Sequence, residues 1–142
     1  MSTLREDAKY IYTRAIEAVL PDEAVRRALD GADFPGRVIL VAAGKAAWRM
    51  ASAAVSALGE RIDTGIVITK YGHAQGMISG IVCREAGHPV PDENSFSAAR
   101  EALALTENLT ADDTVLFLLS GGGSALFENP LVPGAELQDI TA

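Results

Sequence analysis

The chain has 142 residues, enough for one domain with a hydrophobic core. Its composition, 49% apolar and 22% charged, is typical of soluble globular proteins. Nineteen acidic against twelve basic residues give a net charge of −7, which argues against a nucleic-acid partner because such partners bind basic surfaces. Small anionic substrates stay compatible with this charge, since a few local cations can bind them.

The first 31 residues predict two helices. In "TLREDAKYIYTRAIEAVL" the apolar residues recur at helical spacing, and Thr3 with Glu6 has the pattern of a capping box. Pro21 ends this helix, and "DEAVRRALDG" predicts a second, short helix that stops at Gly31.

The rest of the chain alternates between strands and helices. Strands are predicted over residues 37–42, in "TGIVITKYG", in "GIVCREAG" and in "DDTVLFLLSGGG". Helices are predicted in "GKAAWRMASAAVSALG", ending at Gly59, and in "PDENSFSAAREALALTENL", with Asp92 as its N-cap. This order favours an α/β three-layer sandwich with a largely parallel sheet and helices on both faces. The last segment, "VPGAELQDITA", begins a helix and stops, so we expect a fold truncated before completion.

The cysteine content and the N-terminal sequence indicate in which compartment of the cell the protein is found. Cys83 is the single cysteine, which excludes an internal disulfide and a cysteine-based zinc site, and "GIVCREA" predicts that its side chain is buried in the core. The N-terminal segment has early acidic residues and lacks the apolar region of a signal peptide. Apolar runs have the length of strands, too short to cross a bilayer. We therefore expect a cytoplasmic protein with no membrane partner.

The segment "VAAGKAAW" is a candidate ligand-binding turn, because ligands of open α/β sheets gather at the carboxyl ends of the strands. Gly44 permits a tight turn, and Lys45 is expected at the start of the next helix. A cation there is unfavourable beside the positive end of the helix unless it is solvated or binds an anion. On the residues alone, a surface lysine and an anion ligand are equally acceptable.

The segment "LLSGGGSALFENP" predicts an anion-binding loop. Consecutive glycines let successive N–H groups point inward, and Ser120 and Ser124 add hydroxyl donors. A flexible loop is the alternative. We favour the binding loop because residues 115–119 are expected to form an interior strand, and binding loops follow the ends of such strands. The three glycines Gly121, Gly122 and Gly123 come just after this strand.

Two further segments follow predicted strands. In "EAGHPVPDENS" two prolines stiffen the chain, His88 is held extended by the proline after it, and Asp92 is explained as a helix cap. In "TKYGHAQG" an exposed turn is the simplest interpretation of Lys70, Tyr71 and His73.

The motifs of several common enzyme classes are missing. The sequence has no GxxxxGK[ST] phosphate loop and no GxGxxG dinucleotide turn. Its second strand ends in Lys70 instead of the acidic residue that binds the ribose of NAD. There is no GxSxG elbow, which argues against an α/β-hydrolase.

The segments "VAAGKAAWRMA", "EAGHPVPDENSFSAAREAL" and "VLFLLSGGGSALFENP" resemble, in order and spacing, the N-terminal domain of the glycerate 2-kinases that carry a MOFRL-type C-terminal domain. The segment "TGIVITKYGH" between them matches as well. The resemblance covers most of the chain. It implies that residues 1–142 are the N-terminal part of a Rossmann-like kinase domain, and that the C-terminal domain is absent from this chain.

The resemblance implies an enzyme that transfers the γ-phosphoryl group of ATP to the 2-hydroxyl of D-glycerate with Mg²⁺, with this chain alone inactive. It makes Lys45 a catalytic residue that neutralises the phosphates, and residues 120–124 the phosphate-binding loop. His88, Asp92 and Lys70 fall in segments that would surround the substrate, and no carboxylate is a convincing Mg²⁺ ligand or general base. Glycerate and a second copy of the chain are the expected partners.

Two alternatives remain at this point. Family members often carry the name hydroxypyruvate reductase, so an enzyme that uses NAD(P)H is the first. The second is a non-catalytic fragment that binds phosphate.

Overall fold

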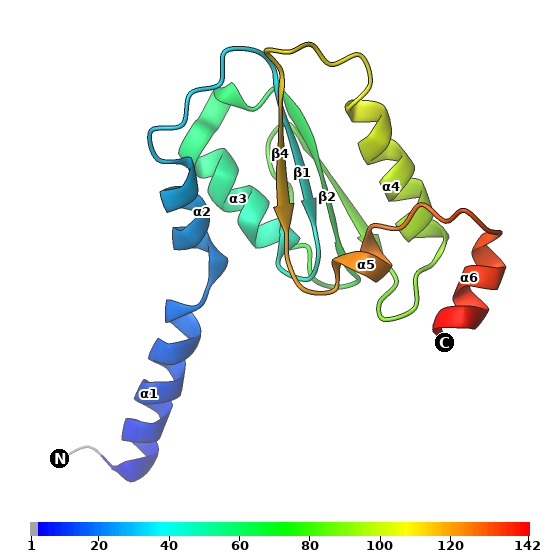
Figure 1. Cartoon of the computed structure of the whole chain (residues 1–142). Coiled ribbons are helices and arrows are strands. Elements are labelled where there is room, and N and C mark those ends of the chain that lie inside the picture. The colour runs from blue at the N-terminus through cyan, green and yellow to red at the C-terminus, as the bar shows by residue number, and fades with distance from the viewer. Residues whose placement is uncertain (1–2) are drawn as a thin grey trace.

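The computed structural model describes residues 3–142, which form three layers of helix, sheet and helix (Figure 1). The sheet has the order β3-β2-β1-β4 and all neighbouring strands are parallel. The strands are β1 (Val38–Ala43), β2 (Thr64–Lys70), β3 (Ile81–Ala86) and β4 (Thr114–Leu119). The predicted α/β class and parallel sheet are confirmed, although β1 begins and ends one residue later than expected.

Helices cover both faces of the sheet, as predicted. α2 (Pro21–Leu29) and α3 (Ala47–Leu58) lie on one face, and a short 3₁₀ helix (Gly59–Arg61) follows α3. Fully buried Ala47, Ala51 and Ala54 give α3 a small-residue face against β1 and β2. α4 (Glu93–Leu105) covers the other face, where its alanines pack against isoleucine and valine side chains of β1 and β2. Because both faces are covered, β1 is buried along its whole length.

α1 (Leu4–Ala18) carries the predicted capping box. The Thr3 side chain accepts a hydrogen bond from the backbone N–H of Glu6, and the Glu6 carboxylate accepts one from the backbone N–H of Thr3. The helix ends before Pro21, which begins α2. α1 extends away from the sheet, and no residue in it is buried (Figure 1). Its large apolar side chains are therefore mostly exposed, among them Leu4 and Ile11.

The expectation that 115–119 is an interior strand is wrong. β4 lies at an edge, and Val115, Phe117 and Leu119 are 37%, 46% and 59% exposed. The interior strands are β1 and β2, each paired on both sides, whereas β4 pairs only with β1 because residues 3–142 supply no strand beyond it.

The expectation of a buried core cysteine is met in part. Cys83 lies on β3, the other edge strand, where it packs against the core beneath α3 but is only half-buried. The partial burial raises the pKa of its thiol, so this side chain is less ready to ionise than an exposed cysteine.

The parallel strands all end at one edge of the sheet, here called the carboxyl edge. The segments that follow β1, β2, β3 and β4 therefore meet there, together with α5 (Gly123–Leu126) (Figure 1). α6 (Gly134–Thr141) follows near the start of α4, where the Gln138 side chain donates a hydrogen bond to the Pro91 carbonyl. Within the described part of the chain, no helix has the length and apolarity needed to span a membrane.

Candidate active site

The turn after β1 is bonded to the turn after β4. The backbone N–H of Ser120 donates to the Ala43 carbonyl at 2.9 Å, and that of Lys45 donates to the Gly121 carbonyl at 2.9 Å. Gly44 has a φ of +117°, and a Cβ on it would collide with Ser120. Lys45 was expected in the first turn of the next helix but lies two residues before α3, with its side chain exposed.

Ser120 joins these two turns through its side chain. Its hydroxyl accepts a hydrogen bond from the N–H of Ala46 at 3.0 Å and donates one to the Ala43 carbonyl at 3.4 Å. The hydroxyl thus holds the Lys45 turn against the end of β4. Its predicted bond to a phosphate oxygen stays a prediction, as does that of Ser124, which lies exposed on α5.

The three glycines differ in backbone conformation and surroundings. Gly121 is exposed, and a Cβ on it would meet no atom within 4 Å. Gly122 has a φ of +85°, in the left-handed region, and Gly123 is buried at the start of α5. Anion-binding nests alternate right- and left-handed backbone, and Gly122 supplies a left-handed residue. No group among residues 3–142 is recorded as accepting a hydrogen bond from the N–H groups of these glycines.

Three segments converge on Gly122. A Cβ at this position would lie 2.8 Å from Nε2 of His88 and 3.1 Å from Cε of Lys45. The loop before α4 therefore brings His88 to the glycine loop (residues 120–124) from one side, and the turn after β1 brings Lys45. Lys70, the last residue of β2, ends at the same edge but is not among the atoms nearest Gly122.

Basic side chains gather at this edge of an acidic chain. Two of the three lysines, Lys45 and Lys70, and both histidines, His73 and His88, follow or end strands there. The ion pairs found in residues 3–142 include none of these four side chains. Lys45 and His88, which form no ion pair among residues 3–142, lie beside glycine-loop N–H groups that have no acceptor there, and this arrangement suits an anion.

Asp92 is engaged by its own loop and helix. It caps α4 as predicted, because Oδ1 accepts from the N–H of Ser95 at 3.1 Å, while Oδ2 accepts from the Tyr71 hydroxyl at 2.6 Å. Partial burial opposes ionisation, but hydrogen bonds from Tyr71, Gly87 and Ser95 outweigh it and hold the pKa of Asp92 below its ordinary value. A contact between Asp92 and substrate stays a prediction.

Glu85 plays a similar part in the loop after β2. Its carboxylate accepts a hydrogen bond from the N–H of Ala74 at 2.9 Å. Bonds from the N–H groups of Ala74 and Gly72 hold the pKa of Glu85 below its ordinary value. Glu85 and Asp92 thus each stabilise a loop near the carboxyl edge.

The described residues do not fit a Mg²⁺ site. No group of three His, Cys, Asp or Glu side chains among residues 3–142 could hold a metal ion. Mg²⁺ prefers carboxylate, water and phosphate oxygens, and both Glu85 and Asp92 are occupied by hydrogen bonds.

Sequence reasoning missed one residue near Lys45. His73, interpreted as part of an exposed turn, is half-buried, and its Nδ1 lies 3.1 Å from the Lys45 carbonyl oxygen. His73, Lys45 and Trp48 line one hollow at the start of α3. The only signal in the sequence was the position of His73 shortly after a strand, which does not reveal its partner.

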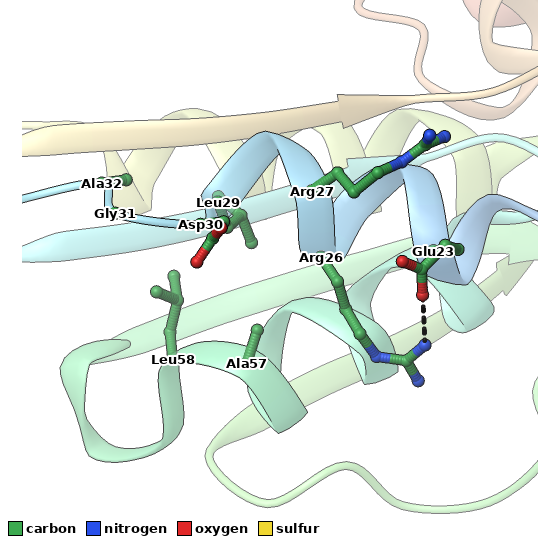
Figure 2. Close-up of a pocket in the computed structure, with 9 residues that line it drawn as sticks. All are labelled: Glu23, Arg26, Arg27, Leu29, Asp30, Gly31, Ala32, Ala57 and Leu58. Carbon is green, nitrogen blue, oxygen red and sulfur yellow. Dashed lines mark hydrogen bonds and ion pairs between the residues drawn. The ribbon is translucent and has the colours of Figure 1, made fainter.

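Another hollow, drawn in Figure 2, lies away from this edge. It is bordered by the end of α2 and by Ala57 and Leu58 at the far end of α3 from Lys45. Arg26 in its wall pairs with Glu23 at 3.5 Å (Figure 2). Because it shares no residue with the carboxyl edge, this hollow is not part of the candidate active site.

Comparison with known proteins identifies the family of this chain. Residues 7–142 match a family model described as a domain of unknown function, DUF4147. The chain is 54% identical to a D-glycerate 2-kinase of Thermotoga maritima over 97% of its own length and 33% of that protein. It is 43% identical to a putative hydroxypyruvate reductase of Agrobacterium vitis over 89% of its own length and 28% of that protein.

The fold is shared with a crystal structure of glycerate kinase from Thermotoga maritima. The TM-score is 0.86 at 53% identity, covering 96% of this chain and 33% of that one. This chain thus spans about one third of the length of the relatives it matches. The chain belongs to the DUF4147 domain family of the glycerate 2-kinases.

Proposed function

We propose that the full-length gene product is a kinase that transfers the γ-phosphoryl group of ATP to the 2-hydroxyl of D-glycerate. The observation that carries the proposal is the convergence of Lys45 and His88 on Gly122, in a loop whose glycine N–H groups have no recorded acceptor. The similarity to a D-glycerate 2-kinase over nearly the whole chain supports it.

The proposed roles follow from the charge of the reacting group. Phosphoryl transfer depends mainly on positioning and on stabilising negative charge, and little on covalent chemistry by the protein. Phosphate oxygens would accept hydrogen bonds from the N–H groups of residues 121–123, and the Lys45 ammonium would neutralise the transferring group. The His88 ring, which borders the same side of Gly122 as Lys45, would donate a hydrogen bond to the substrate.

The remaining parts of the reaction need groups beyond residues 3–142. Glu85 and Asp92 are hydrogen-bonded within loops, and no group of three possible ligands exists among residues 3–142, so Mg²⁺ would be held by nucleotide phosphates and by further ligands. The base that accepts the proton of the glycerate hydroxyl would also come from outside the described residues. We therefore propose the activity for the full-length product and expect none from residues 1–142 alone.

The name of one relative raises hydroxypyruvate reduction as the competing reaction. The local structure disfavours it, because β2 ends in Lys70, where a dinucleotide fold of the NAD type carries an acidic residue. In addition, the turn after β1, where a dinucleotide fold binds the pyrophosphate, is here packed against the Ser120 side chain at Gly44.

One pair of assays decides between these reactions. The full-length gene product is supplied with ATP, Mg²⁺ and D-glycerate, and separately with NAD(P)H and hydroxypyruvate. The proposal predicts ADP and 2-phosphoglycerate in the first assay and no oxidation of NAD(P)H in the second. Oxidation of NAD(P)H without phosphorylation of glycerate would show a reductase instead of a kinase. Inactivity in both assays would favour a non-catalytic protein that binds phosphate.

A further inference from the structure

We infer that His73 is a positioning residue for Lys45, an inference that rests on the proposed kinase function. The His73 ring holds the carbonyl group of Lys45 and thereby fixes the peptide from which the lysine side chain departs.

The hydrogen bond defines the protonation of the ring. Nδ1 of His73 lies 3.1 Å from the Lys45 carbonyl oxygen, which can only accept. Nδ1 must therefore carry the proton and donate it. Because the carbonyl of Lys45 lies outside α3, this bond supplies an anchor that the helix itself does not give.

The peptide before α3 is held from two sides. The N–H of Lys45 donates to the Gly121 carbonyl at 2.9 Å, which ties the peptide to the glycine loop. The carbonyl accepts from His73, which ties it to the loop after β2. With both backbone groups bonded, the exposed Lys45 side chain starts from a fixed point, although its own ammonium has no recorded ion pair in residues 3–142.

The loop that carries His73 is itself anchored. The N–H of His73 donates to the Lys70 carbonyl at 3.0 Å, and the N–H of Ala74 donates to Glu85 on β3 at 2.9 Å. Farther along the loop, the Trp48 indole N–H donates to the Gly76 carbonyl at 2.9 Å. A loop bonded to β2, β3 and α3 can hold the ring steadily enough to orient its partner.

The test uses two side chains that separate the hydrogen bond from the volume of the ring. Asparagine places an amide N–H close to the position of Nδ1, whereas the longer glutamine places its amide nearer to Nε2. Kinase kinetics of the full-length product are measured for His73→Asn, His73→Gln and His73→Ala. Trp48→Phe is the matched control, because it removes a hydrogen bond of the same loop but none of the hydrogen bonds that hold Lys45.

We expect His73→Asn to keep kcat near the wild-type value. His73→Gln and His73→Ala should lower kcat by about 10- to 100-fold, the scale expected for a misplaced catalytic group, with little change in KM. Trp48→Phe should lower Tm and leave kcat nearly unchanged. If His73→Ala fails to fold, the comparison between His73→Asn and His73→Gln carries the test.

Three results would overturn the inference alone. They are equal kcat values for the asparagine and glutamine variants, wild-type kcat in His73→Ala, and a loss of kcat in Trp48→Phe as large as in His73→Gln. Each of these leaves the kinase function intact. A wild-type product that does not phosphorylate glycerate would instead overturn the proposed function, and this inference with it.

Discussion

The ring of His88 lies against the α-carbon of Gly122, and a methyl group at that carbon would lie 2.8 Å from Nε2. Lys45 borders the same position from the turn after β1, with its Cε 3.1 Å from the same point. Gly122 therefore has two independent reasons to be glycine. Its φ of +85° disfavours a side chain, and the space a side chain would take belongs to two residues of the proposed site.

Gly122→Val should abolish nucleotide binding while the domain stays folded. A β-branched residue resists the left-handed backbone, at a cost of about 1–3 kcal/mol, and would push Lys45 and His88 apart. The substitution lies beyond the packed body of β4, so the fold should survive. Thermal unfolding and calorimetric titration with MgATP on the full-length product measure the two effects.

Gly121→Ala is the matched control for strain. Gly121 lacks a positive φ, and a Cβ on it would meet no atom within 4 Å. We expect its Tm to equal that of wild type. Normal MgATP binding by Gly122→Val would show that the loop is a plain turn. Unfolding of Gly122→Val would show that the glycine serves packing, contrary to the proposed role.

Tyr71→Phe should weaken the loop before α4. It removes the hydroxyl that donates to Oδ2 of Asp92 at 2.6 Å and accepts from the Asn94 side chain at 2.8 Å. The loss should destabilise the domain by about 1 kcal/mol and raise the pKa of Asp92 toward its ordinary value. Urea unfolding checks the first effect, with Tyr12→Phe on exposed α1 as the control. Equal midpoints for both variants would contradict this account of the loop.

Asp113 lies just before β4, at the end of the sheet opposite the carboxyl edge. It should make the free energy of unfolding depend on pH. Its carboxylate accepts from the backbone N–H and guanidinium of Arg37 and from the N–H of Thr110, and these bonds, Arg37 first, hold its pKa well below the ordinary value. A lowered pKa in the folded state means that the unfolded chain binds the proton more readily. The stabilisation is therefore complete above the unfolded value of about 4 and is lost as pH falls toward the folded value.

Asp113→Asn tests this sign. Its stability deficit relative to wild type should be constant from about pH 5 upward and should shrink as the pH is lowered below about 4. Unfolding midpoints across that range provide the measurement, and exposed Asp112 offers Asp112→Asn as the neighbouring control. A deficit that grows at low pH would reverse the assignment.

Local patterns in the sequence predicted much of the fold. The capping residues Thr3 and Asp92 act through neighbours three positions away, and buried β-branched strands such as Thr64–Lys70 show their character in composition alone. The glycine loop could be located because its position after a strand is also a local property.

Long-range partners could not be predicted in the same way. The sequence of 115–119 is as apolar as an interior strand. Its strand, β4, lies at an edge only because it pairs with β1 on one side and with no strand on the other. The bond from the Ala46 N–H to Ser120 joins residues 74 positions apart, and that from His73 to Lys45 joins residues 28 positions apart. These partners are set by how the strands assemble, which no local pattern encodes.

The phosphoryl-transfer role of Lys45 is the central claim, and one substitution tests it most directly. The full-length product and its Lys45→Ala variant are compared for transfer from γ-labelled ATP to D-glycerate, with Lys9→Ala on exposed α1 as the control. Lys45 is exposed, so Tm should hardly change, while the loss of a positioned charge should lower kcat/KM by about 100- to 1,000-fold. Near-normal transfer by a folded Lys45→Ala variant would remove Lys45 from the mechanism and contradict the account.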